Sequence, residues 1–418
     1  MSPLRFLGGS FAFIAAVCSA SVATGADWPQ WRGPNRDDIS SETGLLKAWP
    51  AGGPALVWKV AALGGGYSAP SIASGQIFGM GYRGEEEVLW ALDTSNGKEI
   101  WSTRLGAADQ SIGYPEGPRC TPTVDGALLY ALGPGGDLVC LETATGKEVW
   151  RKNFKKDFSG KMMSGWGYSE SPLVDGDQLI CTPGGAKGTL AALNKKTGQL
   201  LWRTADITDN ASYASVVHAQ IEGVWQYVQL TDASVFGVSA DGHKLWRAER
   251  AGRTAVIPTP ICHDNFVYVT SGYGVGCNLF KITAESGGFK AEQVYANKVM
   301  VNHHGAVVLV GEHLYGYSDG KGWVCQNFKT GEMVWSEKEK LGKGSLTYAD
   351  GHLYLRSEAG PGTVALIEAT PSGYKETGRF DQPDRSDKNS WPHPVISNGR
   401  LYIRDQDLLL CYDVKGRN

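Results

Sequence analysis

Four stretches of the chain bring together aromatic, charged and histidine side chains, the residue types that bind ligands and transfer protons in proteins. They span residues 113–119, 163–170, 302–304 and 390–393. The candidate site residues are Tyr114, Arg119, Trp166, Tyr168, Glu170, His303, His304, Trp391 and His393. This set offers three kinds of chemistry: anion binding beside an acid or base, metal or proton binding by histidine, and stacking on aromatic faces.

Arg119 and Glu170 occupy corresponding places in two successive stretches. An arginine beside a carboxyl group suits the binding of an anion next to an acid or base. A structural ion pair between two neighbouring units is the preferred interpretation, because paired charges also perturb each other's pKa in structural networks.

His303 and His304 suggest a metal site, but successive residues of an extended segment point to opposite sides, so only one can face a given site. No cysteine or carboxylate stands nearby at a usual ligand spacing, and we predict no metal site. A single histidine that bonds a ligand or transfers a proton is favoured, and the same alternatives apply to His393.

The loop aromatics Trp166, Tyr168 and Trp391 can form a stacking floor for a planar quinone, a sugar ring or an aromatic side chain of a peptide. They can equally fill a channel with apolar bulk, and the sequence leaves both interpretations open.

An internal repeat positions these stretches. Residues 89–101 recur at 139–150 and 191–202, and two further copies end at later tryptophans. The tryptophans at this position are Trp58, Trp101, Trp150, Trp202, Trp246 and Trp335, and the turn glycines of the five best copies are Gly97, Gly146, Gly198, Gly242 and Gly331. We interpret the tryptophans as packing anchors and not as cofactor ligands. Two decayed copies and a last copy that stops at its turn bring the number of turns to eight.

The other half of each repeat places Asp-Gly or a similar turn between apolar runs, which is the strongest short signal for a hairpin. Each unit therefore predicts four short antiparallel strands, and such sheets bury their faces only by stacking around an axis. We predict an all-β fold, an eight-bladed β-propeller. The last unit lacks its outer strand, and residues 56–60 before the first unit supply a spare one, so this N-terminal strand is expected to join the last blade and close the ring.

The motif Ala-Leu-Asp-x-x-x-Gly-Lys-x-x-Trp resembles the repeat of the pyrroloquinoline quinone (PQQ) family. Residues 27–34 also look like the leader of many secreted PQQ-like propellers. The resemblance extends over nearly all of the chain after residue 26 and implies the propeller fold. The family includes cofactor-free scaffolds of the BamB type as well as quinoprotein alcohol dehydrogenases, so the fold alone does not supply a function.

The resemblance to the dehydrogenases is incomplete. Those enzymes are longer, many place two adjacent cysteines against the cofactor, and they hold Ca²⁺ with a glutamate and an asparagine beside an aspartate base. This chain has no adjacent cysteines and no local cluster of the six to eight oxygen ligands that Ca²⁺ takes. PQQ with Ca²⁺ is kept as a possible cofactor, and none is assigned.

The first 26 residues have the order of a secretory signal peptide, with cleavage expected after Ala26. The apolar run at residues 11–17 falls short of the roughly 20 residues that span a bilayer, and Val17 argues against a lipid anchor on Cys18. We predict a signal peptide at 1–26, an N-terminal extension at 27–54 and a propeller domain at 55–418, in a secreted or periplasmic monomer.

The 418 residues carry a formal net charge of −3 without a long Lys/Arg run, which argues against nucleic acid as a partner. Seven cysteines follow the predicted leader, and Cys262 with Cys277, or Cys120 with Cys140, could form a bridge. The expected function is a scaffold that binds a protein or a small molecule. The alternative is a PQQ-dependent oxidoreductase acting on an alcohol or a sugar.

Overall fold

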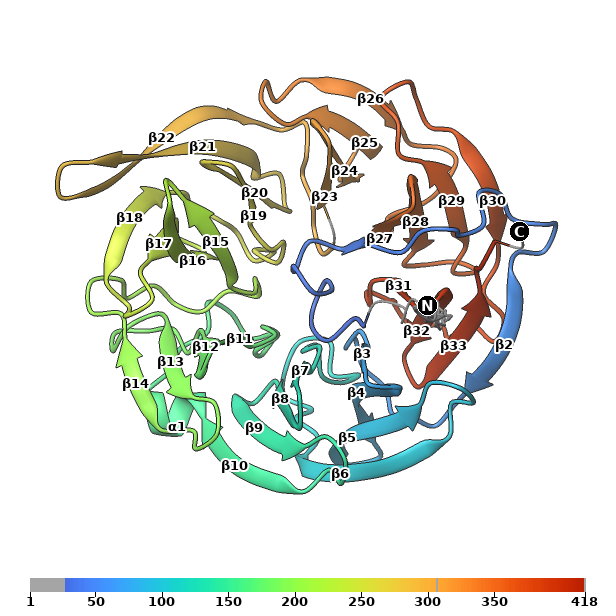
Figure 1. The fold of residues 1–418 in the computed structure, drawn as a ribbon, viewed down its shortest axis with the longest axis horizontal. Helices are drawn as coiled ribbons and strands as arrows, with labels where there is room; N and C mark the ends of the chain where they lie inside the picture. Colours follow the sequence, from blue (N-terminus) through green and yellow to red (C-terminus); the bar gives the residue numbers. More distant parts are fainter. Residues whose placement is uncertain (1–26, 306, 417–418) are drawn as a thin grey trace, which may run out of the picture.

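The computed structural model describes residues 27–305 and 307–416 as a ring of eight antiparallel sheets, or blades, around a central axis (Figure 1). This confirms the predicted all-β, eight-bladed propeller. The helix found in the described residues is the short α1 (Phe154–Phe158), which Asn153 caps with its side chain. The predicted signal peptide and Cys18 lie outside the described residues.

Each blade contains four strands that follow one another from the axis to the rim. Blades 1 and 2 contain β3 (Ser71–Ala73), β4 (Gln76–Arg83), β5 (Glu86–Asp93), β6 (Glu99–Ala107), β7 (Thr123–Asp125), β8 (Leu128–Leu132), β9 (Asp137–Glu142) and β10 (Glu148–Asn153). Blades 3 and 4 contain β11 (Leu173–Asp175), β12 (Gln178–Cys181), β13 (Ala191–Asn194), β14 (Leu200–Arg203), β15 (Val217–Ile221), β16 (Val224–Leu230), β17 (Ser234–Val238) and β18 (Lys244–Glu249).

Blades 5 and 6 contain β19 (Ile261–His263), β20 (Phe266–Ser271), β21 (Gly276–Glu285), β22 (Gly288–Asn297), β23 (Val307–Val310), β24 (His313–Ser318), β25 (Gly322–Asn327) and β26 (Met333–Glu337). Blade 7 contains β27 (Gly344–Ala349), β28 (His352–Ser357), β29 (Val364–Glu368) and β30 (Glu376–Phe380), with β1 (Ile39–Ser40) added in parallel beside β27. Blade 8 contains β31 (Val395–Ser397), β32 (Arg400–Asp405), β33 (Leu408–Asp413) and β2 (Ala55–Val60).

Blade 8 combines one strand from the early part of the described chain with three strands from its last part. Its outer strand β2 pairs antiparallel with β33, with Trp58 opposite Cys411 and Val60 opposite Leu409. The first and last parts of the sequence are thereby hydrogen-bonded within one sheet. In Figure 1 the blue β2 lies at the rim beside the red β33.

The repeat tryptophans pack between neighbouring blades. The indole Nε1 of Trp101 in blade 1 donates a hydrogen bond to the Thr143 carbonyl in the turn of blade 2, at 2.8 Å. The turn residue Gly146 has φ +69°, and a Cβ there would lie 2.4 Å from the Trp101 ring. Glycine is required on both grounds. Trp58, Trp150, Trp202 and Trp335 donate in the same way to the carbonyls of Thr94, Lys195, Ala240 and Thr370.

Blades 4 and 5 depart from this pattern. Trp246 donates instead to the Gln226 side chain of its own blade, at 2.7 Å. Blade 5, whose repeat copy has lost the tryptophan, uses Tyr295 on β22: the Tyr295 ring packs at Gly331, and its hydroxyl donates to the Phe328 carbonyl at 2.9 Å. A large aromatic ring therefore serves at this position without being tryptophan.

Apolar side chains fill the spaces between blades. One buried cluster joins Phe78 of blade 1, Tyr130 of blade 2 and Leu193 of blade 3. The innermost strands β3 and β31 are buried at every residue, whereas most residues of the outer strand β6 are exposed or half-buried. A blade thus depends on its neighbours for its core, as expected of repeat architectures.

Residues 27–40 run through the centre of the ring, where Figure 1 shows them in blue, surrounded by the inner strands. Trp28 exchanges backbone hydrogen bonds with Ile72 of blade 1, and the Pro29 carbonyl accepts from Val124 of blade 2. On the other side, the Arg32 guanidinium donates to the Val307 carbonyl of blade 6 at 2.7 Å. The segment therefore links blades 1 and 2 to blade 6 across the centre of the ring.

Residues 41–54 leave the centre and continue along blade 7. Trp49 packs against Phe380 with ring centroids 5.3 Å apart, and its backbone N–H donates to the Thr377 carbonyl. The chain then enters β2. The whole N-terminal extension is thus in contact with the ring.

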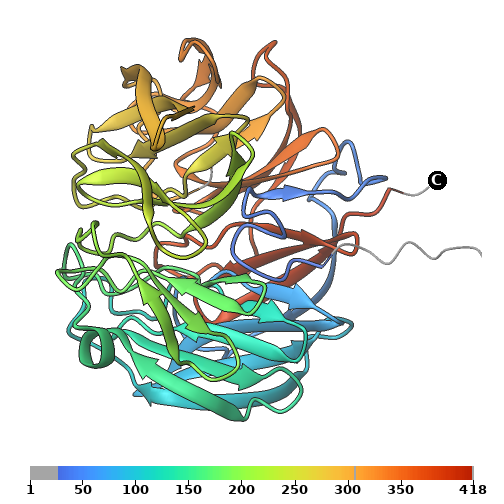
Figure 2. The same cartoon turned by 60° about the vertical axis from the view of Figure 1, so that its left-hand side comes forward.

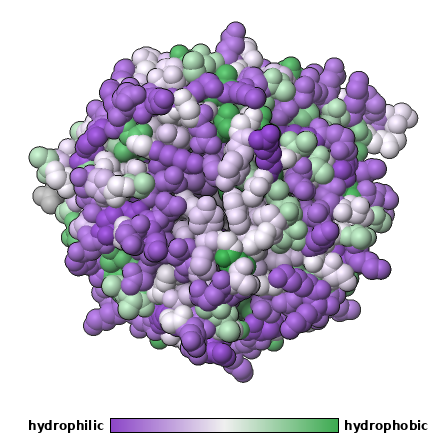
Figure 3. All heavy atoms as spheres, turned by 180° about the vertical axis from the view of Figure 1, so that it is seen from behind, coloured by the Kyte–Doolittle hydropathy of each residue, from purple (hydrophilic) through white to green (hydrophobic). Residues whose placement is uncertain are grey.

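The blades fan around the axis as separate sheets in the turned view of Figure 2. Seen from behind, hydrophilic side chains cover most of the rim, and side chains of intermediate hydropathy gather nearer the centre (Figure 3). Within the described residues the seven cysteines are free, so neither Cys262–Cys277 nor Cys120–Cys140 is bridged. In the same part of the chain, none of the helices has the length and apolar character needed to span a bilayer.

Candidate ligand-binding site at the channel mouth

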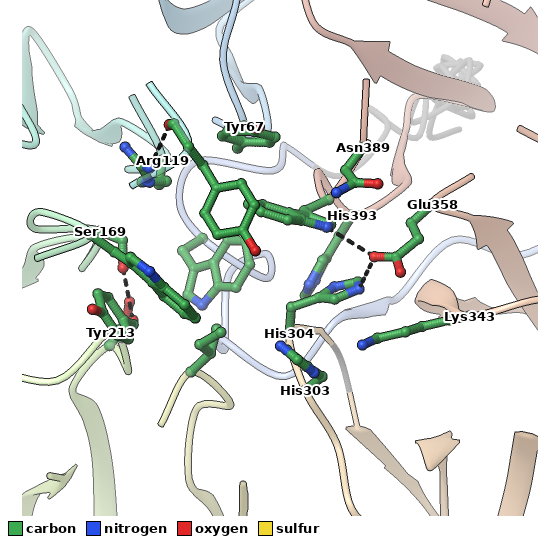
Figure 4. Close-up of a pocket in the computed structure, with 16 residues that line it drawn as sticks. Tyr67, Arg119, Ser169, Tyr213, His303, His304, Lys343, Glu358, Asn389 and His393 are labelled. Atoms are coloured by element: carbon green, nitrogen blue, oxygen red, sulfur yellow. Dashed lines mark hydrogen bonds and ion pairs between the residues drawn. The ribbon is translucent and has the colours of Figure 1, made fainter. Parts of the chain in front are cut away.

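A cavity of about 200 Å³ lies at one end of the central channel, where the loops lead into the innermost strands (Figure 4). Every blade contributes at least one residue to it, and the N-terminal segment contributes Trp31. The lining residues are Trp31, Tyr67, Tyr114, Arg119, Trp166, Ser169, Tyr213, Ser215, Ile257, His303, His304, Lys343, Glu358, Asn389, Trp391 and His393. Because the cavity lies on the ring's axis, residues far apart in sequence meet there.

The N-terminal segment closes the cavity from inside the ring. The rings of Trp31 and His393 pack with centroids 4.4 Å apart, and His393 Nδ1 lies 3.1 Å from Asp38 Oδ1. Asp38 is fully buried and also forms an ion pair with Arg32. Burial alone would raise the pKa of Asp38, but the charges of Arg32 and His393 outweigh it and hold that pKa below its usual value.

One side of the cavity, which we call the aromatic wall, consists of Tyr67, Tyr114, Trp166 and Tyr213. Trp166 stacks on Tyr213 with centroids 5.4 Å apart, and the Tyr114 ring stands edge-on to Trp166 at 5.5 Å. Trp391 joins this wall by stacking on Tyr67 at 4.2 Å. These contacts hold each ring in place before any ligand arrives.

The opposite side, which we call the polar wall, consists of His304, Lys343, Glu358 and Asn389 (Figure 4). Glu358 Oε2 lies 2.6 Å from His304 Nε2 and accepts a hydrogen bond from the Trp391 indole at 2.9 Å. Burial opposes ionisation of Glu358, but His304 and the other donors hold the pKa of Glu358 below its usual value. The carboxylate is therefore charged, fixed in orientation and turned to the cavity.

His304 is buried and its Nδ1 makes no hydrogen bond within the described residues. Burial lowers the pKa of His304, and the neighbouring Glu358 opposes that shift only in part. The imidazole is consequently neutral near pH 7 and has one ring nitrogen free for a ligand. His303 also lines the cavity, but it lies beside Asp319 and not beside Glu358, with Nδ1 3.4 Å from Asp319 Oδ2. Lys343 Nζ lies 3.3 Å from the other oxygen of Asp319.

Arg119 lines the cavity, but its guanidinium is already occupied. It donates to the backbone carbonyls of Gly113, Tyr114 and Gly117 and lies over the Tyr67 ring at 5.7 Å. Burial lowers the pKa of Arg119. Tyr114 adopts φ +59°, an unfavourable conformation for a bulky residue, which these hydrogen bonds help to maintain. Arg119 thus supports the aromatic wall and is not a free anion site.

Two of the nine candidates, Tyr168 and Glu170, do not line the cavity. Tyr168 is buried, and its hydroxyl donates to the Pro183 carbonyl at 3.0 Å. Glu170 is buried and accepts from the Thr182 backbone and hydroxyl at 2.6 and 2.7 Å, and burial raises the pKa of Glu170 to about 7. Among the described residues Glu170 forms no ion pair with Arg119, so neither interpretation of that pair describes the structure.

Arg119 and Glu170 do not meet because the two loops correspond with an offset of one residue from the predicted alignment. Counted from the proline before each inner strand, Arg119 corresponds to Ser169, and Glu170 corresponds to the buried Cys120. The residue three positions before this proline lines the cavity in all five blades that have the proline. These residues are Tyr67, Arg119, Ser169, Ile257 and Trp391. This rule would have found Tyr67 and Ile257 from the sequence.

The proline rule could not have found Glu358. This residue follows β28, the second strand of blade 7, and does not lie in a loop that leads into an innermost strand. The loops of blades 4 and 7 also lack the proline, so Tyr213 and Lys343 were missed with it. Trp31 was missed because nothing in the sequence places residues 27–40 inside the ring.

The described residues contain no group of three or more His, Cys, Asp or Glu side chains arranged to hold a metal ion. Calcium takes six to eight oxygen ligands, whereas Glu358 is the one carboxylate among the described residues that line this cavity, and it faces two N–H donors. The residues present therefore do not fit a PQQ–Ca²⁺ centre of the dehydrogenase kind.

Comparison with known protein families gives one match over most of the ring. The family model described as outer membrane protein assembly factor BamB matches residues 85–337. The BamB protein of Shewanella oneidensis is 24% identical over 234 residues, which cover 53% of this chain and 57% of that protein. The BamB protein of Burkholderia pseudomallei is 27% identical over 204 residues, 47% of each chain. The match thus spans about half the length of these curated relatives.

Solved structures resemble the chain over more of its length. BamB from Moraxella catarrhalis has a TM-score of 0.61 at 14% identity, covering 87% of this chain and 98% of that one. Quinohemoprotein alcohol dehydrogenase from Comamonas testosteroni also has a TM-score of 0.61, at 12% identity, covering 94% of this chain and 81% of that one. At such identities the likeness speaks to the fold alone, since one fold hosts many functions.

Proposed function

This chain belongs to the PQQ-repeat propeller family described as outer membrane protein assembly factor BamB, and on that premise we propose that it is a periplasmic binding scaffold that holds a ligand in the channel-mouth cavity. The single observation that carries the proposal is the cavity itself. All eight blades build it, and its aromatic and polar walls are already held in place by contacts among their own residues. Preorganised sites of this kind spend little free energy on ordering when a ligand binds.

A binding function is favoured over redox chemistry because the charged side chains of the cavity already have partners within the protein. The charged Glu358 already contacts His304 and accepts a hydrogen bond from the Trp391 indole, and the Arg119 guanidinium donates to three backbone carbonyls. Among the described residues that line the cavity, this leaves no cluster of oxygens for Ca²⁺ and no free arginine for a quinone carboxylate. The PQQ-dependent oxidoreductase is therefore the less favoured function.

The proposed compartment rests on the relatives named as outer membrane assembly factors and on the signal peptide expected at residues 1–26. We further propose that the extension at 27–54 and the propeller at 55–418 act as one binding unit, because the segment at 27–40 supplies Trp31 to the cavity. A protein partner would approach the same mouth, where Tyr114 and Asn389 are exposed.

The proposal is tested by a thermal-shift screen of the purified mature protein against sugars, amines, aromatic peptides, and PQQ with Ca²⁺. A ligand at 100 times its Kd stabilises the folded state by about 2.7 kcal/mol. We expect at least one class to raise the Tm of the wild type and not that of Trp166→Ala. Trp225→Ala is the matched control, because Trp225 is 54% exposed and lies at a separate cavity.

A screen in which no class raises the Tm of the wild type would overturn the proposal. So would a ligand that stabilises Trp166→Ala as much as the wild type, or one whose effect is lost in Trp225→Ala. Dye reduction in the presence of PQQ, Ca²⁺ and an alcohol would favour the oxidoreductase instead.

A further inference from the structure

We propose that the ligand of the channel-mouth cavity is a neutral sugar ring, the end residue of a glycan or a free hexose. This inference rests on the proposed binding function and specifies its ligand. It follows from the division of the cavity into two unlike walls, visible in Figure 4 with Tyr67 and Tyr213 on one side and Lys343 and Glu358 on the other.

The aromatic wall favours a ligand with an apolar face. Trp166 is half-buried, Tyr114 is exposed, and their rings meet edge to face at 5.5 Å, so together they form a surface that is neither flat nor closed. A pyranose ring presents C–H groups on one face, and these pack on aromatic rings with release of water. The cavity of about 200 Å³ lies below the range of roughly 300–1,000 Å³ for drug-sized ligands, which suits one small ring.

The polar wall favours a ligand with hydroxyl groups along its edge. Glu358 accepts hydrogen bonds, the Nδ1 of His304 is without a partner, and Lys343 and Asn389 add donors. A hydroxyl group donates one hydrogen bond and accepts two, so vicinal hydroxyls can satisfy acceptors and donors at once. An apolar side chain in the same place would leave these groups unsatisfied, at a cost of about 1–3 kcal/mol each.

The charges of the cavity argue for a neutral ligand. Glu358 already accepts a hydrogen bond from the Trp391 indole and lies 2.6 Å from His304 Nε2, so a cationic amine would have to compete with these groups for the carboxylate oxygens. Lys343 is shared with Asp319 and the Arg119 guanidinium is occupied, so an acidic ligand also lacks a free partner. A planar quinone between two rings would need a parallel slot, but Tyr67 and Trp391 already stack directly at 4.2 Å.

The test is isothermal titration of the mature protein with neutral hexoses and their oligomers, followed by a glycan array. We expect binding that Glu358→Gln and Trp166→Ala each weaken at least about tenfold, the loss expected for one buried hydrogen bond or ring contact. Glu358→Gln keeps the size of the side chain, so it tests the site even where Trp166→Ala folds poorly. Trp225→Ala is expected to bind as the wild type does.

Salt provides an independent readout. The affinity for a neutral ligand is expected to change less than about twofold between 0.05 and 0.5 M NaCl, because no exposed charge pair is formed. Strong weakening by salt would overturn the inference.

The outcomes separate this inference from the function on which it rests. If no sugar binds, but an aromatic peptide, an amine or PQQ binds and Trp166→Ala weakens that binding, the inference of a sugar ligand is wrong and the proposed binding function stands. If no ligand of any class binds, both are overturned.

Discussion

Replacing Asp38 by asparagine tests whether the buried N-terminal segment holds the ring and the cavity together. Asp38 is 0% exposed, pairs with Arg32 and lies 3.1 Å from His393. Asparagine has the same size and tolerates the φ of +59° found here, so the change removes the charge and little else. It leaves the Arg32 guanidinium buried without its counter-ion.

Breaking a buried ion pair from one side costs about 3–5 kcal/mol, and we expect the free energy of unfolding of Asp38→Asn to fall by that amount near pH 7. The neighbouring Asp37→Asn is the matched control. The Asp37 carboxylate accepts from the Ile39 N–H at 3.0 Å, which an amide oxygen can do as well. Burial raises the pKa of Asp37, so loss of its charge is expected to change stability by less than about 1 kcal/mol.

The pH dependence gives a second check on Asp38. Its pKa is lower in the folded state than the ordinary 3.8, so its stabilisation is fully present above that value and is lost as the pH falls through the folded pKa. Urea unfolding followed by tryptophan fluorescence should show a constant gap between wild type and Asp38→Asn from about pH 5 to 8 and a shrinking gap below about pH 4. Equal losses in Asp37→Asn and Asp38→Asn, or a gap that persists at acid pH, would refute this account.

Three further changes follow from single contacts. Gly146→Ala should cost about 1–3 kcal/mol more than Gly126→Ala in urea unfolding, because both glycines have positive φ but only at Gly146 would the Cβ meet a ring, that of Trp101; equal costs would refute the contact. Burial and then Asp137 raise the pKa of Glu87 to about 8, so ionisation costs stability as the pH rises from about 4.5 to above 8. Glu87→Gln should match the wild type in Tm near pH 5 and exceed it at pH 9, by about 1 kcal/mol or more. Arg119→Ala frees three backbone carbonyls and should weaken ligand binding measured by titration at least about tenfold, with a smaller effect on Tm.

The sequence predicted the ring because its signals are local and recur. A turn glycine such as Gly97, with a tryptophan four residues later, marks a turn and the outer strand that follows it, and five of the eight blades carry both signals. The aromatic contact itself is shared between blades, and it tolerates replacement. Tyr295 takes the place of the missing tryptophan of blade 5, which no motif would have revealed.

The site was less predictable because side chains from different blades, far apart in the sequence, come together to form it. The aromatic stretches were found, and seven of the nine candidates line the cavity, but the direction of each side chain depends on register. The two loops align one residue away from the predicted correspondence, so Glu170 is buried in the blade and Ser169 lines the cavity. Glu358 is significant only because His304 and Trp391, from two other blades, meet it on the axis.

The position of the polar wall also limits what family membership can say about the ligand. The family match ends at residue 337, whereas Lys343, Glu358 and Asn389 lie in blades 7 and 8, beyond it. The cavity's closing residue Trp31 lies before the match begins. Within the matched range fall most of the aromatic wall and all the inter-blade tryptophans except Trp58, and any propeller of this repeat needs such tryptophans for its packing. The shared part of the chain therefore accounts for the scaffold, and the polar groups that would select one ligand over another lie outside it, with the exception of His304. A ligand cannot be carried over from the relatives, and the chemistry of Glu358 and its neighbours is the better guide to it.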